Sequence, residues 1–226
     1  MKQPIFKMIG LAMSLFAFSA SAEFVPVPTQ EELPLRLFLG VNENNVWSPA
    51  ALHALQGNAS LVMGLGMGFD FGLMIHGGVG NDKGLFKAGN SADGLIGGDV
   101  MLRYLTHATD LLFLGVQAQA GYSQNLSATN LVPDGANIPV DAGLVVGLNF
   151  ADVINIYAFP GFEFGRKTAA ETAVWGSLIG LNVAAGMMID FGGTSLVLQG
   201  KPRWGNMSDM SNTFSTTFLA GLAWDM

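Results

Sequence analysis

The sequence predicts an all-β protein, an antiparallel up-and-down transmembrane β-barrel of about ten strands. Apolar residues alternate with small or polar ones along many segments, several of these segments are long, and short connections alternate with longer ones. Neighbouring side chains of a strand point to opposite faces, so a period of two indicates strands, whereas helical faces recur every three or four residues. The elements that follow are predicted from this periodicity.

The first 22 residues have the three parts of a secretory signal peptide. Lys2 and Lys7 form a positive region, residues 8–18 are apolar, and residues 20–22 (Ala-Ser-Ala) form a small-residue cleavage site. The apolar run is shorter than the ~20 residues of a membrane-spanning helix, which disfavours a retained anchor. We expect cleavage before Glu23, an N-terminal periplasmic segment at residues 23–34, and the transmembrane β-barrel at residues 35–226.

The composition indicates a membrane environment or a very large core. The 226 residues include 30 Gly, 50% are hydrophobic, and only 12% are charged. Without Lys2 and Lys7 the chain keeps eight basic and 17 acidic residues, a net charge of −9, so no nucleic-acid partner is expected. The absence of Cys excludes disulfide frameworks and thiolate metal sites. No linker-like break divides the chain after the signal peptide, which predicts one domain.

The first clear alternation begins at Ala59. The odd positions from Ala59 to Phe69 are apolar, whereas most even positions are small or polar. Residues 194–204 and 213–225 alternate in the same way. A soluble β-sandwich alternates too, so the length of the runs matters. Several runs reach the ~9 to 11 residues that a tilted strand needs to cross a bilayer, longer than typical soluble strands.

Aromatic residues support the membrane prediction. Threading the runs up and down places them at two levels, as expected where a barrel meets the two membrane interfaces. One level contains Phe69, Phe71, Tyr104, Phe150, Phe191 and Trp224, and the other contains Tyr122, Phe162, Phe164, Trp175, Trp204 and Phe214.

The connections alternate in length, as in bacterial barrels with periplasmic turns and extracellular loops. Asp and Gly suit the short connections, which we predict as periplasmic turns at residues 70–72, 106–110, 150–152 and 190–193. The longer connections are polar and rich in Gly and Asn, and we predict extracellular loops at residues 81–92, 124–138, 166–172 and 205–212.

The strand count depends on the first part of the mature chain. If residues 35–41 form the first strand, the count is ten and both termini are periplasmic. Residues 48–52 (Ser-Pro-Ala-Ala-Leu) would then form a short capped helix in the following loop. If residues 59–80 form one long strand instead, the count falls to eight. We favour ten.

The mature chain resembles the small bacterial outer-membrane β-barrel proteins, in its overall pattern more than in a specific motif. Members of that group end in a strand with a Gly, an aromatic residue and a terminal aromatic residue, which the barrel-assembly machinery reads. Gly221, Trp224 and Met226 occupy these positions here, and Met226 departs from the usual Phe or Trp. The resemblance implies the bacterial outer membrane as location, with outer-membrane lipid and, during biogenesis, the barrel-assembly machinery as partners. A monomer is favoured, but the oligomeric state stays open.

A helical inner-membrane protein is the main alternative fold. Residues 173–189 are mostly apolar and contain Gly176 and Gly180 at the spacing of helix dimers. Asn182 interrupts this run, and the adjoining segments lack the Lys and Arg that orient helical spans. A soluble β protein is the second alternative. We favour the barrel over both.

The alternation assigns fourteen polar side chains of both charge signs to the barrel interior. They are Arg36, His76, Asp99, Arg103, Gln117, Gln119, Asp141, Asn149, Asn155, Glu163, Asn182, Gln199, Lys201 and Arg203. Either they line a watery conduit, or they pair with one another and fill the barrel. Bulky side chains that also point inward favour filling: Phe38, Phe113, Val145, Tyr157, Phe159 and Val197. Inward glycines would leave space: Gly64, Gly66, Gly68, Gly98, Gly115, Gly147 and Gly180.

The expected function is structural, or that of a narrow and weakly selective pore for small solutes or ions. Porins with a wide channel have about 16 to 18 strands, more than this chain can supply. Loop-mediated adhesion or recognition is the alternative function, and a lipid-modifying enzyme is less expected because His53, His76 and His107 are the only histidines. We predict no catalytic residue, no cofactor and no metal site. Met207 and Met210 could bind a soft metal, but two Met in a flexible loop is the favoured interpretation.

Overall fold

A computed structural model describes residues 24–25, 35–48, 52–81, 93–126, 135–167, 175–207 and 210–226. The predicted signal peptide, the rest of the segment 23–34 and the central residues of the long connections lie outside this description. Within the described ranges, no helix has the length and apolar character needed to cross a membrane.

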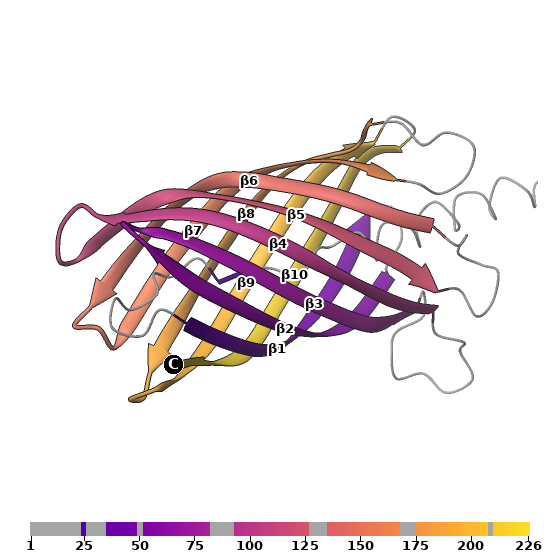
Figure 1. The fold of residues 1–226 in the computed structure, drawn as a ribbon. Coiled ribbons are helices and arrows are strands. Elements are labelled where there is room, and N and C mark those ends of the chain that lie inside the picture. Colours follow the sequence, from indigo (N-terminus) through magenta and orange to yellow (C-terminus); the bar gives the residue numbers. More distant parts are fainter. Residues whose placement is uncertain are drawn as a thin grey trace, which may run out of the picture.

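Ten antiparallel strands form the fold (Figure 1). In chain order they are β1 (Leu35–Ser48), β2 (Leu52–Gly66), β3 (Phe69–Asn81), β4 (Asp93–His107), β5 (Leu112–Leu126), β6 (Gly135–Phe150), β7 (Ile154–Lys167), β8 (Trp175–Asp190), β9 (Thr194–Met207) and β10 (Met210–Asp225). Each strand pairs with its neighbours in the sequence, and β1 pairs with β10, so the sheet is a closed barrel. The prediction of ten strands is confirmed. The helical alternative for residues 173–189 is wrong, because β8 covers most of them.

The closure between β1 and β10 is continuous over most of its length. The pairing runs without interruption from Arg36 opposite Asp225 to Val46 opposite Ser215. Next to the pair of Arg36 and Asp225, the Met226 amide donates a hydrogen bond of 2.7 Å to the carbonyl oxygen of Leu35. A closed barrel leaves no unpaired strand edge, which satisfies the backbone without water.

The outer surface of the barrel is apolar. The outward side chains of Leu102, Leu144 and Leu181 are 55%, 58% and 61% exposed. They alternate with buried side chains along the same strands, as the period of two predicts. A single chain with so much exposed apolar surface needs an apolar surrounding, and a lipid bilayer supplies it.

The four short turns lie at one end of the barrel, together with the C-terminus, on the left in Figure 1. We call it the short-turn end, and the opposite end the long-loop end. The turns after β4, β6 and β8 lie close to their predicted positions. The prediction of a turn at Asp70-Phe71-Gly72 is wrong, because these residues belong to β3 and the turn precedes them, between Gly66 and Phe69. Two glycines with positive φ flank Met67 there and provide the left-handed backbone of the turn.

Several strands extend into residues that we predicted as loops. Residues 124–126, 135–138, 166–167, 205–207 and 210–212 all belong to strands. The first strand likewise continues beyond residue 41 to Ser48. Ser48 and Leu52, predicted within a short helix, lie in β1 and β2, and residues 49–51 lie outside the described ranges. The predicted loops are polar, but polarity does not end a strand, because its backbone can pair with a neighbour beyond the apolar zone.

Candidate functional site in the barrel interior

The structure buries thirteen of the fourteen polar residues that the sequence assigns to the interior, with fractional exposures between 1% and 7%. The exception is Asn149 at the end of β6, which is partly exposed and donates a hydrogen bond of 2.7 Å to Asp152 of the following turn. The fourteen residues belong to β1 and to every strand from β3 to β9. Because the outward side chains of the same strands are exposed, the buried ones face the enclosed space of the barrel. This interior is the candidate functional site.

Two ion pairs and an amide form a connected group on β6 to β9. The Lys201 Nζ donates a hydrogen bond of 2.8 Å to Asp141. The Arg203 guanidinium binds both carboxylate oxygens of Glu163, at 2.7 and 3.1 Å. The Asn182 side-chain amide donates to Asp141 at 3.2 Å. Two cations and two carboxylates therefore balance one another inside the barrel.

Two further ion pairs lie toward the short-turn end. Arg36 binds Asp225 with two hydrogen bonds, one of them 2.8 Å long, and joins the first strand to the last. The Nε of Arg103 donates to Asp70 at 2.9 Å. The Nη1 of the same guanidinium donates a hydrogen bond of 2.7 Å to the carbonyl oxygen of Val25. Asp70 is thus a partner of a buried arginine, which explains why it does not form a turn.

The interior also contains a histidine and a carboxylate on neighbouring strands. The Nε2 of His76 lies 3.2 Å from a carboxylate oxygen of Asp99, and both side chains are buried. A Cβ atom added to Gly97 would collide with the His76 imidazole, and one added to Gly121 would collide with the Asp99 carboxylate. Each polar group therefore occupies the space that a glycine on the neighbouring strand leaves. Among the described residues, no group of three or more metal-ligating side chains could hold a metal ion.

The sequence analysis missed a group of carboxamides on β1 and β2. Asn58 donates a hydrogen bond of 2.8 Å to Asn42, and Thr217 of β10 donates one of 2.6 Å to Asn44. Gln56 is buried beside them. The period of two that assigns Arg36 and Phe38 to the interior continues through this segment and could have identified these residues, but the predicted first strand ends at residue 41 and is followed by a loop.

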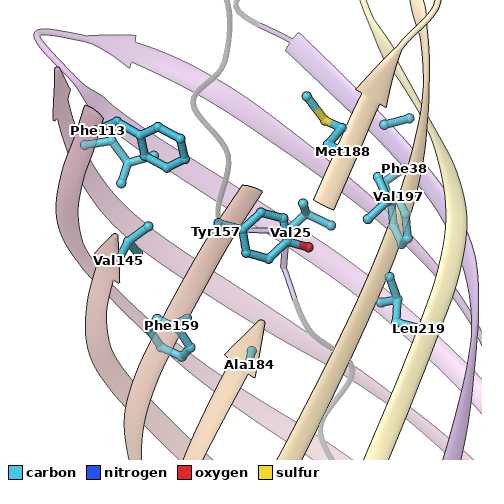
Figure 2. Close-up of a cluster of buried hydrophobic side chains, with 12 residues drawn as sticks. Val25, Phe38, Phe113, Val145, Tyr157, Phe159, Ala184, Met188, Val197 and Leu219 are labelled. Carbon is cyan, nitrogen blue, oxygen red and sulfur yellow. The ribbon is translucent and has the colours of Figure 1, made fainter. Parts of the chain in front are cut away.

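Two clusters of apolar side chains fill other parts of the interior, and together they include residues of all ten strands. Their strand residues are Phe38, Val62, Met74, Met101, Leu105, Phe113, Val145, Tyr157, Phe159, Ala184, Met188, Val197, Leu219 and Ala223. Figure 2 draws many of them around a common centre. The sequence assigned six of them to the interior, and all six are buried.

Aromatic rings occupy the space beside several inward glycines. A Cβ atom added to Gly147 would collide with the ring of Phe113, and one added to Gly221 would collide with the ring of Phe38. At Gly180 the nearest atom is on the guanidinium of Arg203. At Gly147 and Gly180 the expectation that glycine leaves free space in the interior is wrong, because a larger side chain on a neighbouring strand occupies that space.

Three of the glycines assigned to the interior lie elsewhere. Gly66 and Gly68 belong to the turn between β2 and β3 and have positive φ. Gly98 lies between Gly97 and Asp99, which both face inward. Because successive residues of a strand point to opposite faces, Gly98 faces outward.

The described part of the N-terminal segment also lies inside the barrel. Phe24 is 1% exposed and belongs to a buried cluster with Val62, Met74 and Met101. Val25 is 8% exposed and joins the larger apolar cluster. The sequence predicts a periplasmic segment at residues 23–34, and the two of its residues that lie within the described ranges are inside the barrel. They are apolar, so the interior apolar clusters can bury them, whereas the periplasm would expose them.

The outer wall carries a groove of about 770 Å³ across β4 to β8. Bulky apolar side chains such as Leu102, Leu144 and Leu181 border it, and small ones such as Ala142 form its floor. Most of its lining residues point outward, so the groove faces the surroundings of the barrel and not the interior ion pairs.

No protein-family model and no curated protein matches the sequence. Solved structures match the fold. An outer membrane channel from Pseudomonas putida F1 matches with a TM-score of 0.60 and 9% identity, over 91% of this chain and 100% of that one. The β domain of the Bordetella autotransporter BrkA has a TM-score of 0.51 at 9% identity, over 85% and 99%. LpxR from Salmonella typhimurium has a TM-score of 0.50 at 9% identity, over 88% and 86%. The chain therefore has the fold of the bacterial outer-membrane β-barrels.

Proposed function

We propose that this chain is an integral protein of the Gram-negative outer membrane, exported with a cleaved signal peptide, whose interior is closed to solutes in the conformation described. Its role is structural or that of a gated barrel, and it is neither a constitutively open pore nor an enzyme. The two apolar clusters that occupy the interior, with residues from all ten strands between them, carry this proposal.

The membrane location is supported by the surface of the barrel. The outward side chains are apolar, and exposed aromatic residues occur toward both ends. The rings of Phe69 and Tyr104 pack together toward the short-turn end, with 4.9 Å between their centroids. Those of Trp204 and Phe214 pack toward the long-loop end at 5.5 Å. Aromatic side chains at both interfaces are typical of membrane barrels. The groove across β4 to β8 would then contact acyl chains.

The closed interior is supported by polar contacts that cross it. Lys201 on β9 binds Asp141 on β6, three strands away. The Tyr157 hydroxyl on β7 donates to Gln199 on β9, two strands away, at 2.9 Å. The first contact skips two intervening strands and the second skips one, so these side chains extend into the enclosed space. Small barrels are commonly filled by their own side chains in this way.

A structural role is also supported by the pairing of the interior charges. Asp70, Asp141, Glu163 and Asp225 each bind a cation of another strand. A catalytic acid or base must be able to reach a substrate, and these carboxylates are buried against cations. The fold itself does not select a function, since a channel and an autotransporter domain share it.

The conductance of the purified, refolded full chain in a planar bilayer tests the proposal. We expect a current at the baseline of the protein-free bilayer, and no swelling of liposomes that contain the protein. A general-diffusion porin reconstituted in parallel controls for insertion. Frequent, stable channel steps from a preparation shown to be folded by its gel mobility would contradict the closed barrel.

A further inference from the structure

We propose that Phe24 and Val25 form a removable plug: the barrel interior contains a binding site for this apolar dipeptide of the chain's own N-terminal segment, and its withdrawal opens a narrow passage. This inference rests on the proposed function, since a plug has a role only if the barrel is closed while the plug is in place. The binding site consists of an apolar pocket for Phe24 and a polar anchor for the backbone at Val25.

The pocket for Phe24 is formed by β2, β3 and β4. The aromatic ring is buried with Val62, Met74 and Met101. A Cβ atom added to Gly72 would collide with this ring and with the Met101 methyl group, so the ring uses the space that this glycine leaves. Two of the three wall side chains are methionines, which are flexible and adapt to a neighbouring group. The pocket therefore suits a bulky apolar side chain that can leave and return.

The polar anchor is the guanidinium of Arg103. Its Nη1 donates a hydrogen bond of 2.7 Å to the carbonyl oxygen of Val25. Asp70 holds the same guanidinium through its Nε at 2.9 Å and through its Nη2 at 2.8 Å. A peptide carbonyl among apolar side chains needs a donor, because burying it without one is costly. The interior thus satisfies the backbone as well as the side chain of the dipeptide.

Val25 lies in the middle of the barrel. Figure 2 draws it between opposite walls, with Phe113 and Val145 on one side and Phe38 and Val197 on the other. These residues belong to β1, β5, β6 and β9, which surround the interior. The segment therefore fills the space that the wall side chains leave at the centre, and its removal would leave a passage bordered by them.

The dipeptide is held differently from the strands around it. Phe24 and Val25 belong to no strand and take no part in the closed sheet. Their described contacts are the apolar packing and the hydrogen bond from Arg103. Withdrawal breaks none of the interstrand hydrogen bonds that close the barrel, so the segment can leave while the barrel stays folded.

Disulfide trapping tests whether the dipeptide occupies this site in the membrane. The chain contains no Cys, so an introduced pair reports on one contact only. Phe24→Cys combined with Met101→Cys should form a cross-link on oxidation of isolated outer membranes. Phe24→Cys combined with Val41→Cys, whose wild-type side chain is 49% exposed on the outer face, should not. Equal cross-linking of both pairs, or none in either, would overturn the proposed placement.

Conductance tests whether the dipeptide closes the barrel. Removing both side chains with Phe24→Gly and Val25→Gly should raise the fraction of time in an open state at least about tenfold over the wild type. The conservative pair Phe24→Leu and Val25→Ile should stay at the wild-type level. The cross-linked Phe24→Cys/Met101→Cys protein should be closed, and reduction of the same sample should open it.

These measurements separate the two proposals. A wild-type protein that conducts contradicts the closed barrel itself. A silent wild type with equally silent glycine variants contradicts the plug and leaves the closed barrel standing. If the glycine variants do not show the gel mobility of a folded barrel, the oxidised and reduced states of the double-cysteine protein decide, and identical conductance in both states overturns the plug.

Discussion

At the scale of single residues, the interior combines burial with the pairing of most of its charges. The Arg203 and Glu163 side chains are 9% and 3% exposed and are joined by two hydrogen bonds. A buried pair of this kind adds little stability relative to apolar residues of the same size, whereas the loss of one partner leaves an uncompensated charge. The polar side chains therefore constrain one another, and single and double substitutions should behave differently.

This asymmetry is testable at Glu163. Glu163→Gln should lower the free energy of unfolding by about 3–5 kcal/mol, because Arg203 then stays buried without a carboxylate. Adding Arg203→Met should restore a large part of the loss. Urea unfolding of the folded protein in detergent, followed by tryptophan fluorescence, measures both. A double variant that loses the sum of the two single losses would show that these side chains do not act as a pair.

At the scale of elements, the turn between β2 and β3 depends on a backbone that few residues adopt. Gly66, Met67 and Gly68 have φ values of 85°, 55° and 83°. Their surroundings differ, since a Cβ atom at Gly66 would meet nothing within 4 Å, whereas one at Gly68 would collide with the carbonyl oxygen of Leu105. Because the two glycines have the same backbone conformation but different surroundings, substituting each of them distinguishes the cost of backbone strain from the cost of a steric clash.

The two glycines predict unequal costs. Gly66→Ala should lose about 1–2 kcal/mol of stability, the cost of a left-handed backbone for a residue with a Cβ. Gly68→Ala should lose a further ~1–3 kcal/mol, because Leu105 cannot move without disturbing its own hydrogen bond to Gly68, 2.8 Å long. Chemical unfolding of both variants measures the difference. Equal losses would mean that the turn relaxes freely.

The last strand closes the barrel, so its end should control assembly. Deleting residues 224–226 removes the pairing of Trp224 with β1 and the backbone bond from Met226 to Leu35. We expect periplasmic, protease-sensitive protein. Met226→Phe should assemble at least as well as the wild type, because the backbone bond stays and the side chain is 51% exposed.

A charge on the outer face of the same strand should also be costly. Leu222 is 42% exposed on that face, and Leu222→Arg should lose ~2–4 kcal/mol if the residue lies at mid-bilayer. Leu222→Ile is the matched control. Membrane fractionation and protease accessibility report assembly, and normal assembly of the arginine variant would contradict a lipid-facing Leu222.

At the scale of the whole molecule, cooperativity comes from closure. Every strand has two paired neighbours, and the pairing of β1 with β10 joins residues 189 positions apart in the sequence, such as Arg36 and Asp225. Opening the sheet at any point exposes two unpaired edges to lipid, where unsatisfied backbone groups cost several kcal/mol each. The barrel should therefore remain intact under conditions that unfold less cooperative proteins.

The closed sheet predicts a heat-modifiable protein. Unboiled samples in mild detergent should migrate differently from boiled samples on gels, and circular dichroism should report strands far in excess of helices. Size-exclusion chromatography with light scattering checks the proposed monomer. A helix-dominated spectrum, or the same mobility before and after boiling of a folded sample, would refute the barrel.

The sequence by itself determined the class of fold, favoured the correct number of strands, and assigned most of the polar interior residues to the inner face. Every strand of a barrel separates the same two environments, so the polar Ser60 between the apolar Ala59 and Leu61 already distinguishes the inside from the outside. The same local rule assigned fourteen polar residues to the interior, as far apart in the chain as Arg36 and Arg203, and the structure buries all of them except Asn149.

Only the tertiary structure decided which of these side chains meet. Arg203 binds Glu163 across an intervening strand, Asp70 binds an arginine in place of forming a turn, and Phe24 enters the interior. The tilt and stagger of the strands bring such residues together, and these are properties of the closed sheet as a whole. The period of two along one strand does not predict these contacts. Strands can be staggered by different amounts and still keep the same side chains on the inner face.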